Sequence, residues 1–302
     1  MPKATINGTR IHYLQAGDGP DLVMLHGLAA DLSFWFLRIV PRLKDRWRVT
    51  ALDLRGHGYS DAPPSGYRTA DLAEDLLGLI DHLDIARPHV VGHSFGGAVA
   101  LHHAVNRPDR LESLALVDSR VHALQPIPPF DDGPFWENRR AKLRAAGMSV
   151  PEGTPKVFYM LLEETLMLAE EGLAQRAIPP GLIPWKHGSR MDRRVRRLIS
   201  ETTLASDVRE TAGLTEDAIR GVTAPTLLSY GALSQCMKTC RALEKLLPLH
   251  RTVIHPALGH FFPTSRPEVV ANDLAVFLEE MEGSNAVRSA RVASSPIRPS
   301  GV

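Results

Sequence analysis

The sequence predicts an α/β protein with a doubly wound, mostly parallel eight-stranded sheet, and two observations support this prediction. Short runs that are apolar at nearly every position, such as residues 22–27 and 89–94, are typical of strands buried on both faces. Segments with apolar residues three and four positions apart, such as residues 69–83, lie between these runs. Strand and helix therefore alternate, which favours parallel strands joined by crossover helices.

The individual elements follow in order along the chain. Asn7-Gly8 is a strong two-residue hairpin signal, so the chain is predicted to open with two short antiparallel strands. Buried strands are predicted at residues 22–27, 48–56, 89–94 and 111–119, then at 224–231 and 251–260, and a last helix at 266–282.

The pattern changes between Val121 and Arg220, where strand-like runs disappear and three helical stretches alternate with proline-rich joints. We predict an α/β core formed by residues 1–120 and 221–282, with residues 121–220 as a helical cap inserted between strands 6 and 7. The small, polar and proline-containing tail, residues 283–302, is predicted to be disordered.

Composition narrows the class of protein. With 302 residues, 44% of them apolar, and a formal net charge of +1, the chain has enough apolar residues for a large core and no global charge that would recruit nucleic acid or an anionic membrane. No signal peptide or membrane span is predicted. Cys236 and Cys240, four residues apart, are predicted to be reduced rather than paired or metal-bound, which favours a cytoplasmic protein without a metal site.

The stretch Gly92-His93-Ser94-Phe95-Gly96 follows a predicted strand and opens a predicted helix. This glycine-x-serine-x-glycine pattern in this context is typical of a nucleophile elbow, a sharp turn that exposes the serine at the end of the sheet. The alternative is a tight strand-to-helix turn with an incidental serine. We interpret Ser94 as a nucleophile.

A serine nucleophile needs a base, and position along the chain selects it. His260 follows the last predicted strand, so it lies at the same edge of the sheet as Ser94. His93 adjoins Ser94 and is interpreted as a packing residue, while His26 and His57 are predicted to line the pocket. The backbone N–H groups of Phe95 and Leu28 are the candidate oxyanion hole.

The motifs LHG at 25–27, DLRGHGYSD at 53–61, GHSFGG at 92–97 and GH at 259–260 resemble those of the α/β-hydrolase fold family, from Thr5 to the last helix. The resemblance implies a serine-acid-histidine order, a backbone oxyanion hole, a helical cap and no cofactor. It also implies that branches with an aspartate nucleophile, the epoxide hydrolases and haloalkane dehalogenases, are excluded by Ser94.

The chain departs from this family pattern at the acid. Most members carry an aspartate shortly after the seventh strand, where this chain has Ser234, and no Asp or Glu occurs between Ile219 and Ala242. Some branches take the acid from the end of the sixth strand, where this chain has Asp118. We therefore predict Asp118 as the acid, while a purely structural aspartate at the loop is the alternative.

The predicted cap carries two further signals. Arg190, Arg193, Arg194 and Arg197 fall on one helix face, which indicates either a solvated surface or a docking patch for an acidic carrier protein. Aromatic residues of the cap, with two residues of the core, are predicted to bind an apolar acyl group; the candidates are Trp136, Phe158, Trp185, His26 and Phe261.

Together these features predict a serine hydrolase of the carboxylesterase or thioesterase type that cleaves a carboxylester, thioester or lactone through an acyl-enzyme on Ser94. Two alternatives remain. The same fold hosts cofactor-free oxygenases, C–C hydrolases and cyclases, in which the histidine acts on the substrate directly. A degenerate member that binds a ligand without turnover is the other alternative, and Ser234 in place of an acid is its main support.

Overall fold

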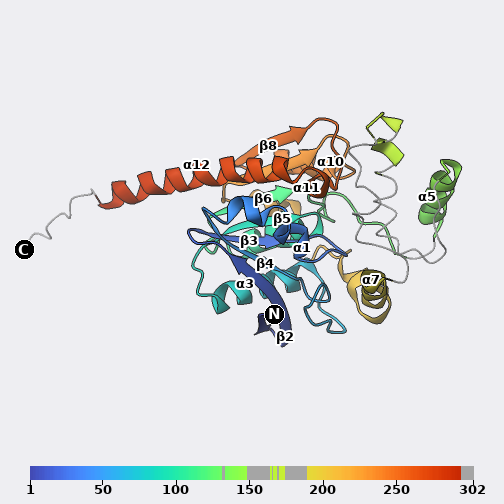
Figure 1. Cartoon of the computed structure of the whole chain (residues 1–302), viewed down its shortest axis with the longest axis horizontal. Helices are drawn as coiled ribbons and strands as arrows, with labels where there is room; N and C mark the ends of the chain where they lie inside the picture. Colours follow the sequence, from blue (N-terminus) through green and yellow to red (C-terminus); the bar gives the residue numbers. More distant parts are fainter. Residues whose placement is uncertain (131–132, 148–163, 165, 169, 174–188, 294–302) are drawn as a thin grey trace, which may run out of the picture.

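The computed structural model describes residues 1–130, 133–147, 164, 166–168, 170–173 and 189–293 (Figure 1). Within these residues eight strands form one sheet in the order β1-β2-β4-β3-β5-β6-β7-β8. β1 and β2 are antiparallel to each other, β2 is antiparallel to β4, and every other neighbouring pair is parallel. The predicted fold class is confirmed. The strands are β1 (Lys3–Ile6), β2 (Thr9–Ala16), β3 (Asp21–Leu25), β4 (Arg48–Leu52), β5 (His89–His93), β6 (Ser113–Val117), β7 (Thr226–Gly231) and β8 (His250–His255).

Helices of the described residues cover both faces of this sheet (Figure 1). Those of the core are α1 (Ser33–Phe36), α2 (Val40–Leu43), α3 (Thr69–His82), α4 (Phe95–Asn106), α10 (Met237–Leu246), α11 (Phe262–Ser265) and α12 (Pro267–Ala293).

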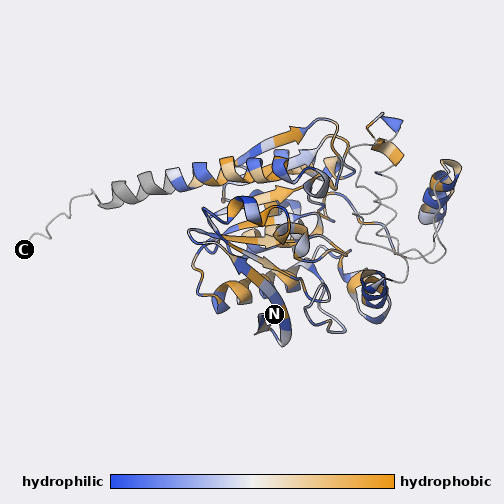
Figure 2. Ribbon diagram, viewed as in Figure 1, coloured by the Kyte–Doolittle hydropathy of each residue, from blue (hydrophilic) through white to orange (hydrophobic). Residues whose placement is uncertain are grey.

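Two hydrophobic clusters lie on opposite faces of the sheet, and each buried strand contributes to both. In β3, Val23 and Leu25 pack in the cluster with α3, α4 and α10, while Leu22 and Met24 pack in the cluster with α1, α2 and α12. Because successive side chains of a strand point to opposite faces, a strand covered on both sides must be apolar throughout. Figure 2 shows the hydrophobic colour of the central strands.

The segment between β6 and β7 (residues 118–225, the β6–β7 segment) has no strand among its described residues. It contains α5 (Pro134–Ala145), α7 (Arg190–Glu201), α8 (Leu204–Asp207) and α9 (Glu216–Arg220). Figure 1 shows α5 and α7 beside the sheet rather than on either of its faces, and Figure 2 shows both helices with much hydrophilic surface. The domain boundaries drawn from the sequence remain predictions.

The last helix extends further than the sequence indicates. α12 continues past Glu282, where the sequence ends the predicted helix, to Ala293, and the disorder of the tail stays a prediction. Glycine costs a helix only about 1 kcal/mol, and the stretch from Gly283 to Ala293 contains no proline to end it. Residues 294–302 lie outside the described part of the chain.

The structure bears on the predictions made for the cysteines and for membrane spans. Both cysteines are free thiols and both are buried. Among the described helices, none has the length and apolar character needed to cross a bilayer. The cytoplasmic location remains a prediction.

A buried ion pair joins the loop after β4 to α3. Arg55 donates from Nε and Nη2 to the two oxygens of Asp75, each at 2.6 Å, and the two side chains are only 9% and 4% exposed. We expect Asp75→Ala to lower the free energy of unfolding by about 3–5 kcal/mol, because it leaves a guanidinium buried without its partner. Denaturant unfolding measures this, and Glu74→Ala on the same helix, whose pair with Arg107 is half-exposed, should cost no more than about 1 kcal/mol. Equal losses in the two variants would contradict the prediction.

Candidate active site

Ser94 lies in the turn between β5 and α4, in a backbone conformation that side chains rarely adopt (φ 53°, ψ −119°). The flanking glycines allow this turn because other backbone lies against them. A Cβ on Gly92 would lie 2.3 Å from the carbonyl oxygen of Gly96, and one on Gly96 would lie 2.3 Å from that of His26. The motif is therefore steric in origin: no larger residue fits at either position, and the strained turn between them holds the serine at the carboxyl end of the strand.

Ser94, His260 and Asp118 form a hydrogen-bonded line. His260 Nε2 lies 3.0 Å from Ser94 Oγ, and His260 Nδ1 lies 3.0 Å from Asp118 Oδ1. The imidazole is buried and the carboxylate completely so. A hydrogen bond from Nδ1–H to the carboxylate leaves the Nε2 lone pair facing the serine hydroxyl, which is the tautomer that accepts its proton.

Asp118 follows β6 directly and has a positive φ of 44°. Its carboxylate also accepts from the Gly231 N–H at 2.9 Å and from the Ser234 hydroxyl. Ser234 stands where most members of the family carry the acid. In this structure its hydroxyl donates to the carboxylate of Asp118, which follows the neighbouring strand β6. Its Oγ in turn accepts the Cys236 N–H at 2.9 Å, which fixes the direction of the hydroxyl.

The electrostatic surroundings of His260 favour its charged form. Burial disfavours the imidazolium, but the Cys236 sulfur and the Asp118 carboxylate outweigh burial and raise the pKa of His260 well above 6.5. Asp118, Cys236 and His260 bring three possible metal-ligand atoms within 4.8 Å of one another. Because His260 Nδ1 and Asp118 Oδ1 already bond each other, we assign these atoms to the acid–histidine pair rather than to a metal.

His93 supports the histidine from the other side. Its Nε2 donates to the His260 carbonyl oxygen at 3.1 Å, and its ring stacks on Phe34 at a centroid distance of 4.5 Å. Burial and the nearby His260 lower the pKa of His93 well below 6.5, so the ring is neutral. These contacts are those of a packing residue.

The loop after β3 lies directly beside the nucleophile. A Cβ on Gly27 would lie 3.0 Å from Ser94 Cβ, so the residue before Leu28 lies against the serine. Neither the Leu28 N–H nor the Phe95 N–H has a hydrogen-bond partner among the described residues, which leaves both donors available to an oxyanion. Asp53, buried after β4, holds this loop by accepting the Leu32 N–H at 2.7 Å.

The structure corrects the predicted role of His26. Its Nδ1 donates to the Gly27 carbonyl oxygen at 2.8 Å, and its Nε2 accepts the Leu54 N–H at 3.1 Å. Both ring nitrogens are engaged by backbone, and the ring is fully buried, so His26 orders the loop and has no nitrogen left for a substrate. His57 is also buried, and burial lowers its pKa to about 3.

The other predicted substrate-binding residues fall into three groups. Phe261 lies beside the base, with its ring centroid 4.9 Å from that of His260. Trp136 is buried in α5, where its Nε1 donates to the Pro129 carbonyl oxygen, and it has no contact with the serine or histidine among the described interactions. Phe158 and Trp185 lie outside the described residues.

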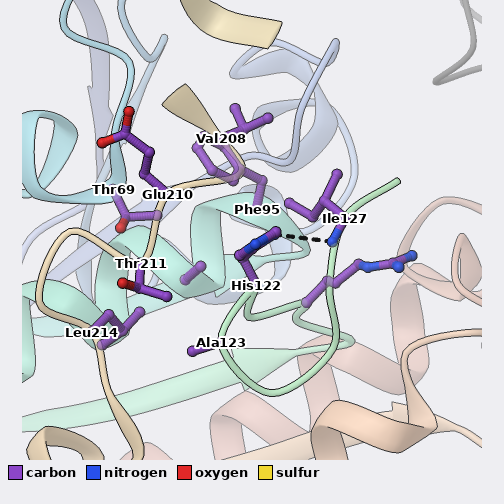
Figure 3. Close-up of a pocket in the computed structure, with 11 residues that line it drawn as sticks. Thr69, Phe95, His122, Ala123, Ile127, Val208, Glu210, Thr211 and Leu214 are labelled. Carbon is purple, nitrogen blue, oxygen red and sulfur yellow. Dashed lines mark hydrogen bonds between the residues drawn. The ribbon is translucent and has the colours of Figure 1, made fainter. Parts of the chain in front are cut away.

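A small pocket lies against the helix that begins at the nucleophile (Figure 3). Phe95 lines it, and the Ile127 N–H donates to His122 Nδ1 at 3.0 Å in its wall, as the dashed line shows. Its lining is largely apolar with a polar edge, and consists of Thr69, Phe95, Ala98, Arg120, His122, Ala123, Ile127, Val208, Glu210, Thr211 and Leu214.

The arginine run forms helix α7 as predicted by its spacing. Arg190 and Arg194 lie over the ring of Tyr59, at 5.2 and 5.1 Å from its centroid. Arg197 pairs with Glu201 at 3.1 Å. Arg193 is exposed on the same helix. Docking of an acidic carrier protein on these four residues stays a prediction.

Two residues of the site escaped the sequence interpretation. Ser234 was considered only as a missing acid, whereas it donates to Asp118. Glu164, in the β6–β7 segment, is buried, and its carboxylate accepts the backbone N–H groups of His260 and Phe261 at 2.7 and 3.1 Å. The signal for Glu164 is its spacing: Leu168, four residues later, is buried, which puts an acid on an apolar helix face.

The fold and the site together define an α/β protein with a serine, a histidine and an aspartate in line at the carboxyl edge of a parallel sheet. The family model of the alpha/beta hydrolase fold matches residues 20–150. The solved structure of an enol-lactonase from Burkholderia xenovorans LB400 superposes with a TM-score of 0.66 at 26% identity, covering 92% of this chain and 100% of that one. The chain has the α/β-hydrolase fold, and it resembles that family most directly over the residues that the family model matches.

Curated relatives match over different lengths. A 2-(acetamidomethylene)succinate hydrolase of Mesorhizobium japonicum is 27% identical over 282 residues, which are 92% of this chain and 94% of the relative. A soluble epoxide hydrolase of Corynebacterium sp. (strain C12) is 39% identical over 116 residues, 38% of this chain and only 40% of the relative. Both relatives are hydrolases by name, and the chain spans less than half of the length of the epoxide hydrolase.

Proposed function

We propose that this protein is a serine hydrolase that cleaves an ester-type bond, in a carboxylester, thioester or lactone, of a largely apolar acyl substrate. The observation that carries the proposal is the line from Ser94 Oγ through His260 to Asp118, with 3.0 Å at both hydrogen bonds. Nucleophile, base and orienting acid are within hydrogen-bond reach of one another, as nucleophilic catalysis requires.

The geometry supports the following reaction. His260 Nε2 takes the proton of Ser94 as Oγ attacks the carbonyl carbon, and Asp118 stabilises the imidazolium that forms. The Leu28 and Phe95 N–H groups donate to the oxyanion. His260 then gives the proton to the leaving oxygen or sulfur, and an acyl-enzyme on Ser94 remains. Water, activated by the same histidine, releases the acid.

Two further observations support the proposal. The enol-lactonase whose structure superposes on this chain takes its name from a lactone, which is a cyclic ester. The ring of Phe261, whose centroid lies 4.9 Å from that of His260, offers an apolar surface beside the base. We also propose that the β6–β7 segment acts as a cap over the site, since its Glu164 contacts the loop of His260.

A substrate panel tests this function. We expect turnover of p-nitrophenyl esters, with a preferred acyl length, together with a burst of p-nitrophenol and a mass increase of one acyl group on Ser94 in the intact protein. A matched series of acyl thioesters and lactones then identifies the preferred leaving group. Absence of any acyl adduct, with cleavage of a C–C bond or none at all, would contradict the proposal and favour a member in which His260 acts on the substrate directly.

A further inference from the structure

Glu164 is a buried carboxylate that the proposed reaction does not use. It lies in the β6–β7 segment, 96 residues before His260, and is 8% exposed. Its Oε2 accepts the His260 N–H at 2.7 Å and its Oε1 accepts the Phe261 N–H at 3.1 Å. Both oxygens of one carboxylate therefore bind consecutive backbone donors of the loop that carries the base.

Gly259 makes this approach possible. A Cβ at position 259 would lie 2.5 Å from both Cδ and Oε1 of Glu164, closer than real atoms come. Gly259 does not have a positive φ, so its role here is to leave room for the carboxylate rather than to adopt a left-handed conformation.

Three groups hold the backbone and ring of His260. Glu164 accepts from its N–H, His93 donates to its carbonyl oxygen at 3.1 Å, and Asp118 accepts from Nδ1 at 3.0 Å. The first and third are buried carboxylates at well-separated positions in the chain, and each contacts the histidine. A base that must stay within hydrogen-bond distance of Ser94 depends on such fixed support, because a misplacement of about 1 Å can cost 10²-fold in rate.

We propose that Glu164 is a positioning residue: its carboxylate holds the backbone of His260 and Phe261 so that the base keeps Nε2 at Ser94 and Nδ1 at Asp118. This inference rests on the proposed function of the same site.

Burial disfavours the charged form of the Glu164 carboxylate. Burial raises the pKa of Glu164 to about 7, against the charge of His260 and the two backbone donors, which lower it, while the charge of Asp118 raises it further. His260 and Asp118 are the ionisable groups that face Glu164 among the described residues. An amide at this position would avoid the burial of a charge, so a role in stability alone does not require the acid.

The first experiment compares Glu164→Gln with wild type. Gln keeps the shape of the side chain but removes the charge and one acceptor, so we expect kcat to fall about 10- to 100-fold, with KM changed less than about threefold and no loss of melting temperature at pH 8. The acid limb of the pH–kcat/KM profile should move to lower pH, because the negative charge that favours the imidazolium is gone. Glu164→Asp should recover part of kcat.

Glu170→Gln is the matched control. Glu170 is an exposed glutamate six positions further along the same segment, so the same substitution there should leave kcat, the pH profile and the melting temperature unchanged. A fall in kcat that only accompanies a fall in melting temperature, with the acid limb unmoved, would overturn the inference.

Gly259→Ala supplies an independent test through a double-mutant cycle. In the wild-type background its Cβ meets the Glu164 carboxylate, so kcat should fall as it does in Glu164→Gln. In a Glu164→Ala background the carboxylate is absent, and Gly259→Ala should cause little further loss. Additive losses would show that Gly259 and Glu164 act separately and would overturn the inference.

A titration of His260 by NMR separates this inference from the proposed function, since it needs no substrate. The pKa of His260 should be lower in Glu164→Gln than in wild type and unchanged in Glu170→Gln. An unchanged pKa in Glu164→Gln overturns the role of Glu164 whether or not the protein hydrolyses esters, while failure of every ester together with a shifted pKa overturns only the proposed function.

Discussion

Ser94→Ala should abolish turnover of every ester that the wild-type protein hydrolyses, with a loss in kcat of roughly 10⁵- to 10⁶-fold. Ser94 Oγ is the atom that forms the bond to the substrate carbonyl, and no other hydroxyl of the described residues lies within hydrogen-bond distance of His260 Nε2. The acyl adduct seen by mass spectrometry should disappear with it. Steady-state kinetics at high enzyme concentration measure the residual rate.

The substitution leaves the fold intact, since alanine at position 94 takes the same backbone conformation as serine and removes a single atom. Ser206→Ala, at an exposed serine of α8, is the matched control and should retain full activity. Residual activity above about 1% in purified Ser94→Ala, free of wild-type contamination, would remove Ser94 from the chemistry. It would move the proposal to a reaction in which His260 acts directly on the substrate.

Asp118→Asn should lower kcat by about 10⁴-fold, which corresponds to about 5 kcal/mol of transition-state stabilisation. Asparagine adopts positive φ nearly as readily as aspartate, so the turn at 118 is preserved and the change is confined to the carboxylate. Its amide can donate to His260 Nδ1, which favours the tautomer with the proton on Nε2. That tautomer cannot accept the proton of Ser94.

Ser234→Asp in the Asp118→Asn background tests the same point by rescue. Ser234 Oγ bonds Asp118 Oδ1, which lies 3.0 Å from His260 Nδ1, so a carboxylate at 234 comes within reach of the histidine. We expect recovery of at least tenfold in kcat. In the wild-type background the same change places two carboxylates together and should lower activity instead.

Asp45→Asn, at a carboxylate whose side chain is 83% exposed, controls for the loss of a negative charge elsewhere and should be neutral. If Asp118→Asn has the activity of Asp45→Asn, Asp118 is a structural residue of the loop and not the acid of the site.

The order of the elements could be predicted from local patterns. The runs that form β3, β5 and β6 are largely apolar because both faces of those strands are covered. A run of consecutive apolar residues can be recognised from the sequence without any knowledge of the tertiary structure. The end of α12 could not be placed in the same way. The residues after Glu282 are mostly small and polar and carry no apolar periodicity that would predict a helix, whereas α12 continues to Ala293.

The nucleophile is a local feature, since Gly92, Ser94 and Gly96 lie within five residues and a single turn explains all three. The base was found by its position after the last strand. The assignment of the acid depended on the tertiary structure. Sequence showed that Ser234 cannot serve and that Asp118 ends the sixth strand, but only the pairing of β6 with β7 brings the two side chains into contact.

The contacts of His26 could not be predicted from the sequence. Its place in a loop at the right edge of the sheet favoured a substrate-binding role, and the backbone of Gly27 and Leu54 takes both of its nitrogens. The Gly27 carbonyl belongs to the neighbouring residue, but the Leu54 N–H follows β4, and only the pairing of β3 with β4 brings it within reach of the ring.

By itself, then, the sequence determined the fold class and the elbow at Ser94, because hydrophobic periodicity and short-range sterics control these features. His260 was selected by its place after the last strand, and Asp118 by the resemblance to family branches that take the acid from the sixth strand. Only the tertiary structure decided how the acid is held, which histidine is structural and which buried carboxylate supports the base. Those depend on hydrogen bonds between residues far apart in the chain, 116 positions for Ser234 and Asp118 and 167 for His93 and His260. Such contacts exist only after the strands have paired and the β6–β7 segment has packed against the loop of His260.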